Sequence, residues 1–196
     1  MTNTDIRLRD ATADDALLLA KLIDIAGEGI PSWLWQQSAT VEETFLDVGA
    51  ARARRTTGGF SFSNAVVALR GEQPVGMVLS YPIDAAPGDD PDDLPAPVAP
   101  FVALEIRSVG TWYINALAVL PGYRSCGAGT VLMRHSEKLA RAAGYEKMSI
   151  QVYGQNTGAV RLYTRLGYTQ ISAAPVRLHP CQPYYTGDVL LLTKDI

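Results

Sequence analysis

Hydrophobic and polar residues follow two different periods along this chain, and the changes between them mark the expected strands and helices. Short runs that alternate in polarity, or that are wholly apolar and bounded by turn residues, are typical of β-strands. Apolar residues that recur every three or four positions are typical of amphipathic α-helices. The expected strands cover residues 6–12, 64–69, 74–83, 111–120, 147–153, 168–172 and 188–196. The expected helices cover residues 15–26, 41–56, 130–144 and 156–167.

Capping and turn residues support several of these boundaries. Asp14 and Asn156 each stand at the start of an expected helix and are candidate N-caps, because their side chains can accept a backbone N–H. Gly144 and Gly167 each end an expected helix, where glycine readily takes the left-handed conformation that stops it. Residues 70–73, "RGEQ", join two apolar strands and predict a hairpin.

The stretch "GEGIPSWLW", residues 27–35, interrupts the helical pattern. Its glycines and proline predict a loop after the first helix. Trp33 and Trp35 are large side chains for a loop. They either pack on the core or line a pocket for an apolar part of a ligand.

A second irregular stretch covers residues 84–100 and holds five Asp and five Pro among seventeen residues. This composition predicts a solvated insertion loop without regular structure. An alternative is an acidic lid for a cationic substrate. We expect the loop to interrupt a single domain that covers residues 1–196.

Composition and charge narrow the function classes. The chain has 47% hydrophobic residues and a formal net charge of −3, so it has no general attraction to nucleic acid or to an anionic membrane. No apolar run approaches the roughly 20 residues that span a bilayer, and the first ten residues do not resemble a signal peptide. We therefore expect a cytoplasmic protein. "HPC" at 179–181 supplies too few ligands for zinc, so no metal site is expected.

The most informative stretch is "VLPGYRSCGAGTVLM", residues 119–133, between an expected strand and an expected helix. The first N–H groups of a helix have no acceptor within the helix, and the helix dipole makes that end positive. Gly127 and Gly129 allow a large anion to approach the backbone, and Arg124 adds a positive charge. The turn is thus suited to a phosphate or pyrophosphate. The spacing matches neither the dinucleotide-binding nor the P-loop pattern.

The pattern "ALAVLPGYRSCGAGTVLM" resembles the pyrophosphate-binding motif of the GCN5-related N-acetyltransferase (GNAT) family, R/Q-x-x-G-x-G/A after a strand. "NTGAVRLYTRLGYTQ" resembles the second signature of that family. The two motifs cover about residues 111–172 in the family's order. The resemblance implies an α/β (α+β) GNAT fold. That fold has a mixed central sheet of about six to seven strands, about four flanking helices, and a splayed strand pair that holds the cofactor.

The resemblance also implies positions for acetyl-coenzyme A. The pantetheine arm would pair with the backbone of Leu117, Ala118 and Val119, on a strand that splays away from residues 147–153. Further contacts are implied for Asn156, Ala159 and Tyr163, and the spacing of Ala159, Leu162, Tyr163 and Leu166 independently predicts one helical face. The pyrophosphate would lie on the N–H groups of Arg124, Ser125, Cys126, Gly127, Ala128, Gly129 and Thr130.

Tyr163 stands at the position of the family's general acid, and we expect it to protonate the departing thiolate. The alternative is that Tyr163 is a packed core residue. Many members carry a carboxylate on the strand before the phosphate loop, but residues 111–120 contain none. Glu105 and Glu28 lie elsewhere, and the sequence does not choose between them. His135 is expected to be a packed or surface residue, and Cys126 is not expected to be a nucleophile.

The resemblance implies an N-acetyltransferase in which an amine attacks the thioester directly, with acetyl-coenzyme A as cosubstrate and no metal. A binding module for acyl-coenzyme A without turnover is the alternative, favoured by the missing strand carboxylate. The aromatic stretches favour a small amine with an apolar part as the partner, and a homodimer is left open. Candidate acceptor-binding residues are Glu28, Trp33, Tyr113, Asn115 and Tyr184.

Overall fold

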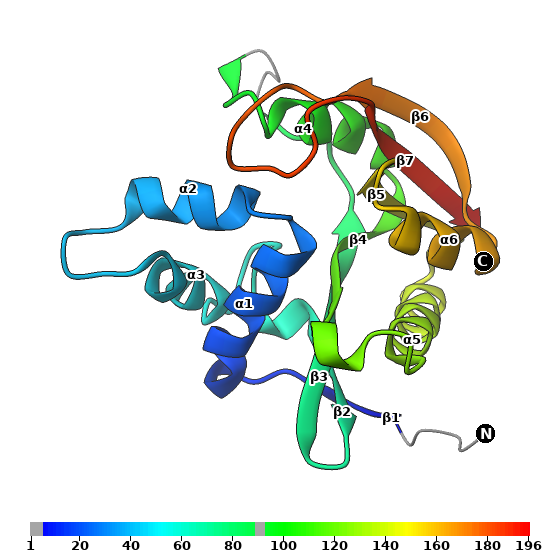
Figure 1. The fold of residues 1–196 in the computed structure, drawn as a ribbon. Coiled ribbons are helices and arrows are strands. Elements are labelled where there is room, and N and C mark those ends of the chain that lie inside the picture. Colours follow the sequence, from blue (N-terminus) through cyan, green and yellow to red (C-terminus); the bar gives the residue numbers. More distant parts are fainter. Residues whose placement is uncertain (1–5, 89–92) are drawn as a thin grey trace. The chain divides into compact units, whose positions relative to one another are not determined.

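The computed structural model describes residues 6–88 and 93–196, and these contain seven β-strands and six α-helices (Figure 1). All seven predicted strands and all four predicted helices are present, and α2 and α4 are additional. The strands are β1 (Ile6–Asp10), β2 (Ala65–Arg70), β3 (Gln73–Ile83), β4 (Thr111–Val119), β5 (Lys147–Tyr153), β6 (Thr169–Pro175) and β7 (Asp188–Asp195). The helices are α1 (Ala16–Ala26), α2 (Ile30–Ser38), α3 (Phe45–Ala53), α4 (Ala99–Glu105), α5 (Ala128–Ala142) and α6 (Thr157–Arg165).

The strands form a mixed sheet with the order β1-β2-β3-β4-β5-β7-β6. β1, β2 and β3 pair antiparallel, whereas β4 and β5 pair in parallel. β7 lies antiparallel between β5 and β6. Arg70 pairs with Gln73, and the intervening Gly71 has a φ of 61°, so the predicted hairpin between β2 and β3 is confirmed. The mixed α/β fold class is confirmed as well.

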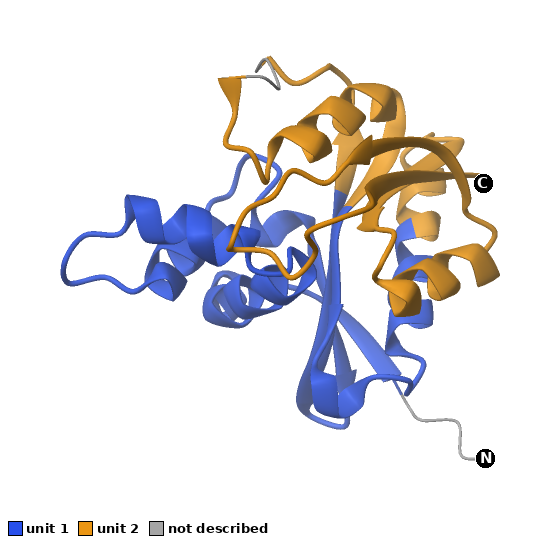
Figure 2. Cartoon of the chain, turned by 45° about the horizontal axis from the view of Figure 1, so that its top comes forward, with its two compact units in different colours: residues 1–80, 115–136 blue, residues 81–114, 137–196 orange. Residues whose placement is uncertain are grey.

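The described elements gather into two compact units, coloured separately in Figure 2. Unit 1 comprises residues 1–80 and 115–136, and unit 2 comprises residues 81–114 and 137–196. β4 and α5 each contribute residues to both units. The core of unit 1 includes Leu19 and Leu22 of α1 with Val67 of β2, whereas that of unit 2 includes Met148 and Leu191. A single domain over residues 1–196 stays a prediction.

The predicted loop at residues 27–35 is wrong, because α2 begins at Ile30 within it. Gly29 has a φ of 96° at the N-cap, and Pro31 occupies the first turn. A proline there loses nothing, since its missing N–H would have no acceptor within the helix. The N–H of Ser32 donates to Asp24 Oδ1 at 2.8 Å, which satisfies a further donor of that turn. The breaker residues therefore separate two helices rather than form a long loop.

Trp35 packs in the core of unit 1, as one of the two interpretations of the tryptophans predicted. Its side chain is only 3% exposed, and it stacks on Phe60 with a centroid distance of 5.7 Å. A Cβ atom on Gly49 of α3 would lie 2.5 Å from the Trp35 ring, so the ring needs a glycine opposite it. Trp33 is half-buried on the same helix, and its role as a pocket residue stays a prediction.

The acidic, proline-rich stretch at residues 84–100 is only partly the irregular loop that its composition predicts. Residues 89–92 lie outside the described residues, whereas α4 begins at Ala99. Ala99 and Pro100 are buried, and the N–H of Val98 donates to the carbonyl of Pro95 at 2.8 Å. The prediction of no regular structure is therefore wrong at this end, since proline is compatible with a helix in its first turn. The acidic-lid hypothesis stays untested.

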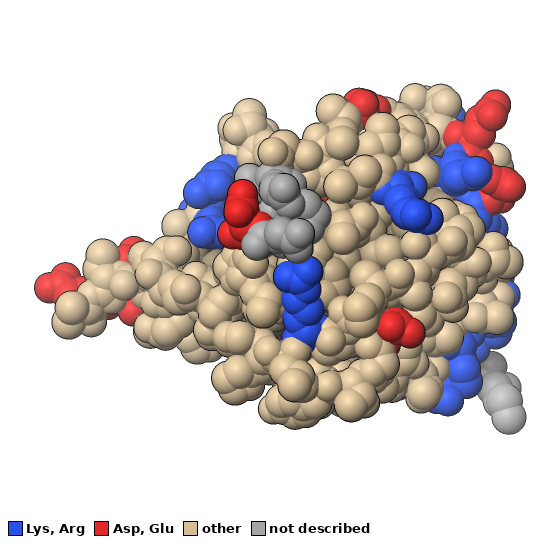
Figure 3. All heavy atoms as spheres, turned by 90° about the horizontal axis from the view of Figure 1, so that it is seen from above, with Lys and Arg blue, Asp and Glu red and all other residues tan. Residues whose placement is uncertain are grey.

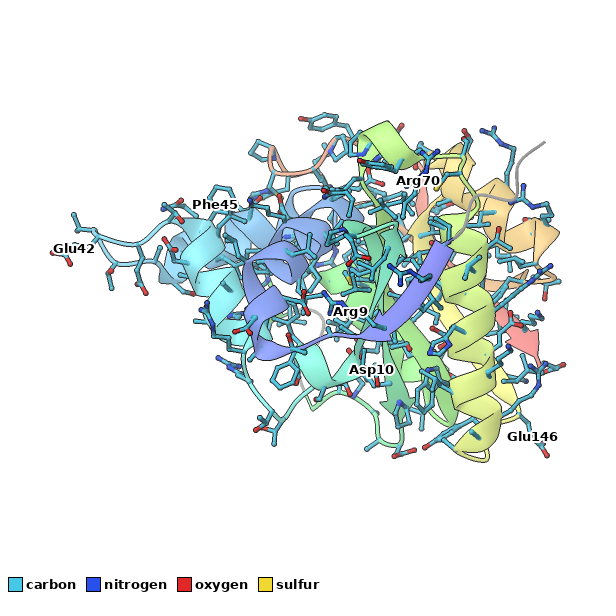
Figure 4. All side chains as sticks on the ribbon, turned by 90° about the horizontal axis from the view of Figure 1, so that it is seen from below. Arg9, Asp10, Glu42, Phe45, Arg70 and Glu146 are labelled. Carbon is cyan, nitrogen blue, oxygen red and sulfur yellow. The ribbon has the colours of Figure 1, made fainter. Side chains whose placement is uncertain are left out.

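Asp15, rather than the predicted Asp14, organises the start of α1. Its carboxylate accepts two hydrogen bonds from the Arg9 guanidinium on β1, both at 2.7 Å, and one from the N–H of Thr12 at 2.8 Å. Figure 4 labels Arg9 on its strand. The hydrogen bonds from Arg9 are the main reason why the pKa of Asp15 lies below its usual value.

We expect Asp15→Asn to lower the free energy of unfolding at pH 7 by about 1 kcal/mol, the scale of a partly exposed ion pair or a lost cap. Because the folded-state pKa is lowered, this stabilisation exists above the unfolded-state pKa and is lost as pH falls through the folded-state pKa. Urea unfolding at several pH values between 7 and 3 measures the free energy of unfolding of wild type and of Asp15→Asn. The difference between the two proteins should shrink as the pH falls. Asp14→Asn is the matched control on an exposed neighbour. A difference that is constant with pH would contradict the assignment.

Candidate active site

The predicted turn between a strand and a helix is confirmed in unit 1. β4 ends at Val119, a short 3₁₀ turn covers Pro121–Tyr123, and α5 begins at Ala128. Ala128 is buried, which anchors the start of the helix in the core. The residues before it stay at the surface, because Arg124 and Gly127 are exposed.

The backbone of this turn adopts the left-handed conformation twice. Ser125 has a φ of 62°, which is uncommon for a residue other than glycine, and Gly127 has a φ of 91°. Turns that contain such residues orient successive N–H groups into a concavity that binds anions. A Cβ atom on Gly127 would meet nothing within 4 Å, so the backbone there faces open space. Together with the helix start, this geometry suits a large anion.

Within unit 2, the second set of predicted cofactor residues lies along α6. The side-chain oxygen of Asn156 accepts the N–H of Ala159 at 3.1 Å, so the predicted N-cap is confirmed. Gly167 follows the helix with a φ of 91°, as predicted. Arg161, Thr164 and Arg165 are exposed, whereas the predicted face is buried at Tyr163 and half-buried at Ala159, Leu162 and Leu166, which confirms it.

Tyr163 is the most buried residue of that face, with 4% of it exposed. Its ring centroid lies 6.2 Å from that of Tyr168, a buried residue just beyond the helix. Lys194 of β7 lies over the other ring, with its Nζ 5.7 Å from the Tyr168 centroid, and pairs with buried Glu137 at 2.8 Å. The ring of Tyr163 therefore has a defined neighbour, and a conservative change to its hydroxyl can be tested without removing that contact.

The five candidate acceptor residues fall into two groups. Glu28, Trp33 and Asn115 belong to unit 1, whereas Tyr113 and Tyr184 belong to unit 2. Glu28 has a φ of 51°, in the left-handed region, directly before Gly29. Asn115 is exposed on β4.

Tyr113 and Tyr184 each pack against a second aromatic side chain of unit 2. Tyr113 is buried on β4 and meets Tyr81 edge to face at 6.0 Å. Tyr184 tilts against Tyr153 of β5 at 4.8 Å, and the Tyr153 hydroxyl donates to Gln182 at 2.7 Å. Tyr113 and Tyr184 are predicted acceptor residues, whereas their partners Tyr81 on β3 and Tyr153 on β5 are not.

Glu105, one of the two carboxylates left open, is the last residue of α4 and is half-buried. Burial raises its pKa above the usual value. Burial also raises the pKa of Tyr113, and the negative charge of Glu105 adds to that shift. The carboxyl group of Glu105 and the phenol of Tyr113 are therefore electrostatically coupled.

The sequence predicts neither a metal site nor a membrane span, and the structure bears on both predictions for residues 6–88 and 93–196. Among them, no group of three or more His, Cys, Asp or Glu side chains could hold a metal ion. Cys126 and Cys181 are both free thiols, and His135 is half-buried in α5.

No helix in the described ranges is long and apolar enough to cross a membrane. On the face drawn in Figure 3, basic and acidic side chains are dispersed, and neither sign forms a continuous patch.

Comparison with known proteins decides the family. Residues 19–168 match the Acetyltransferase (GNAT) family. The chain belongs to this family. This GNAT chain is also 38% identical over 55 residues to streptothricin acetyltransferase from Streptomyces lavendulae. The matched stretch covers 28% of this chain and 29% of that relative.

Solved structures show the same fold as this GNAT chain. A GCN5-related N-acetyltransferase from Kribbella flavida has a TM-score of 0.63 at 18% identity, and the match covers 100% of both chains. YncA from Salmonella typhimurium, solved with its cofactor acetyl-CoA, has a TM-score of 0.63 at 18% identity. That match covers 97% of this chain and 94% of the other. The resemblance in the two motifs is therefore confirmed at the level of family and fold.

The individual cofactor contacts of this GNAT chain stay predictions. Leu117 and Val119 on β4 are half-buried and Ala118 is buried, so the backbone implied for pantetheine lies at the margin of the core of unit 1. The splay of β4 from β5, and the joint use of the turn before α5 and the face of α6, concern residues of different units. Both expectations remain to be tested by ligand binding.

Proposed function

We propose that this protein transfers the acetyl group of acetyl-coenzyme A to the nitrogen of an amine by direct attack. The observation that carries the proposal is the turn before α5, where Arg124, two left-handed residues and the N–H groups of a helix start occur together. Membership in the Acetyltransferase (GNAT) family supports the reaction class.

The turn offers what a pyrophosphate needs. Residues 124–130 would donate backbone N–H groups, and the Arg124 guanidinium would add a charge-assisted contact. The open space beside Gly127 leaves room for the phosphate oxygens. The backbone of Leu117–Val119 would hold the pantetheine arm, with Asn156 and Ala159 as further contacts.

Acetyl-coenzyme A would supply an acetyl thioester, whose leaving group is a thiolate. Backbone N–H groups of β4 would stabilise the negative charge that develops on the carbonyl oxygen. Tyr163 would hold a proton and give it to the sulfur, because a phenol is protonated at neutral pH. Thiolate release would then leave coenzyme A as the neutral thiol.

A second candidate function is a binding module for acyl-coenzyme A that does not turn over. The observation in its favour is that β4, Thr111–Val119, carries no carboxylate. The binding turn and the fold would serve either function equally well. Turnover is therefore the property that separates them.

We expect the wild-type protein to release coenzyme A thiol when acetyl-coenzyme A is mixed with a suitable amine. A first panel would contain L-lysine, 1,4-diaminobutane, agmatine, tyramine and streptothricin, with thiol release followed by a chromogenic disulfide. Calorimetry with acetyl-coenzyme A alone measures binding separately. Binding without acceptor-dependent thiol release would favour the second candidate, and no binding would contradict both.

A further inference from the structure

The face of unit 2 beneath α4 brings one carboxylate together with aromatic rings. Phe101 and Glu105 lie one helical turn apart, so they project from the same side of α4. The Phe101 ring meets Tyr153 of β5 edge to face at 5.3 Å, and the charge of Glu105 acts on Tyr113 of β4. Tyr113 pairs with Ser149 in the parallel register, so Tyr113 and Tyr153 occupy the same face of the two strands.

More rings extend this face on both sides. Tyr81 of β3 meets Tyr113, and Tyr184 meets Tyr153. Aromatic faces attract ammonium groups, and a neighbouring carboxylate adds a full negative charge. The aromatic wall consists of Tyr81, Phe101, Tyr113, Tyr153 and Tyr184. A wall of this kind with one carboxylate has the chemistry that binds a protonated amine.

We propose that Glu105 accepts the proton of the acceptor amine, and that this acceptor is an aliphatic amine that is protonated in neutral solution. The proposal rests on the acetyl transfer proposed above and names its acceptor class and its base. Glu105 is half-buried, so it is accessible from solvent, and its charge acts on the buried Tyr113.

The proton balance follows from the reactants. An ammonium nitrogen carries three protons and the amide product carries one, so two protons leave the nitrogen. One passes to the Glu105 carboxylate and then to water. The other balances the proton that the sulfur takes up, because Tyr163 gives its proton to the thiolate and regains one from the nitrogen. The C–N bond forms as the C–S bond breaks, and no oxidant or metal is needed.

The electrostatic surroundings of Glu105 suit a base. Its raised pKa has burial as its cause, so its carboxylate is a stronger proton acceptor than that of an exposed glutamate. The facing titratable group on β4 is Tyr113, with Tyr81 beyond it.

The other elements near α4 bring few competing charges. β6 has no ionisable side chain, and on β7 Lys194 and Asp195 are paired with Glu137 and Lys147. Asp188 at the start of β7 and Arg107 just after α4 are exposed. A strong cation that would hold Glu105 ionised and weaken it as a base is therefore not among its contacts in the described part of the chain.

The test compares wild type with Glu105→Gln on 1,4-diaminobutane or on the aliphatic amine of the panel that wild type acetylates fastest. At pH 7 kcat/KM should fall about tenfold, at the low end of general-base contributions because water also accepts protons. The deficit should shrink as pH approaches the pKa of the amine, near 10.4 for a lysine-like group, since solution then supplies the neutral form. A structural role would give a deficit that does not change with pH.

The melting temperature, measured without any ligand, provides a second test beside the kinetics. An acid whose folded-state pKa is raised destabilises the fold once pH rises through the unfolded-state pKa. Glu105→Gln should therefore raise the melting temperature at pH 8 and leave it unchanged at pH 4. Lowered stability at both pH values would overturn the assignment, because it would indicate a structural contact.

The matched control is Glu146→Gln, an exposed glutamate whose side chain projects outward in Figure 4. It should leave both the kinetics and the melting temperature unchanged. If wild type turns over aliphatic amines and Glu105→Gln behaves like the control, Glu105 is not the base and the proposed function stands. If wild type acetylates only amines that are neutral at pH 7, the acceptor class is wrong. If wild type shows no turnover, the proposed function itself fails.

Discussion

Replacing Tyr163 with phenylalanine is expected to lower kcat tenfold or more while the affinity for acetyl-coenzyme A stays unchanged. The change removes one hydroxyl and keeps the ring, whose centroid lies 6.2 Å from that of Tyr168. If Tyr163 gives a proton to the sulfur, its loss acts on the chemical step alone. General acids contribute roughly 10²–10⁴-fold, and a thiolate needs less help than a poorer leaving group. Steady-state kinetics and calorimetry measure the two quantities separately.

The control is Tyr168→Phe, which removes a hydroxyl from the neighbouring buried ring. Its kcat should stay within about twofold of wild type, because no role in proton transfer is proposed for Tyr168. Circular dichroism of both variants should match wild type. An unaltered kcat for Tyr163→Phe between pH 6 and pH 9 would show that Tyr163 is a core residue, the alternative that its burial also permits.

Replacing Gly127 with valine is expected to weaken acetyl-coenzyme A binding by about 10- to 100-fold, the equivalent of one or two charge-assisted hydrogen bonds. Gly127 has a φ of 91°, which a β-branched residue rarely adopts, and its side-chain position faces the open space proposed for the pyrophosphate. Valine would therefore reshape the turn and occupy that space. Titration calorimetry with acetyl-coenzyme A measures the effect.

Strain alone must be separated from lost binding, and Gly144 provides the comparison. It lies beyond the other end of α5 with a φ of 86°, and a Cβ atom there also meets nothing within 4 Å. Gly144→Val should lower the melting temperature about as much as Gly127→Val while leaving the affinity unchanged. Equal affinity in both variants would contradict the proposed site.

The sequence predicted those elements whose period and boundaries are both local. β5 runs from Lys147 to Tyr153, as its apolar pattern predicts, and α6 lies between its expected Asn156 cap and Gly167. The two stretches for which the predicted structure is wrong both contain prolines. The compositions of residues 27–35 and 84–100 predict loops, but Pro31 and Pro100 each occupy the first turn of a helix, where a missing N–H costs nothing. Only the conformation of the preceding residues distinguishes these two roles of proline.

The candidate site likewise has one part that the sequence predicts and one part that it does not. The anion-binding turn was predictable because its arginine, small residues and glycines are consecutive in the sequence. The aromatic wall was not, since Tyr81, Phe101 and Tyr153 come from three separate elements, β3, α4 and β5. The only sequence signal of Tyr81 and Tyr153 is the inward phase of alternating strand residues, and that phase does not reveal which rings meet. A carboxylate outside the expected strand could therefore be noted but not chosen.

The position of β7 has a consequence for how the chain folds during synthesis. β6 is the edge strand at one end of the sheet, and its neighbour β7 lies between β6 and β5. Because β7 follows β6 in the sequence, β6 is synthesised before the strand with which it pairs. In the register of β5 and β7, Lys147 pairs with Asp195, so nearly fifty residues must leave the ribosome before that pairing is complete. Until then β5 and β6 present unpaired edges, a state that favours contact with other chains. Completion of this half of the sheet must therefore wait for β7, and the emerging chain is exposed to misassembly or chaperone capture during that interval.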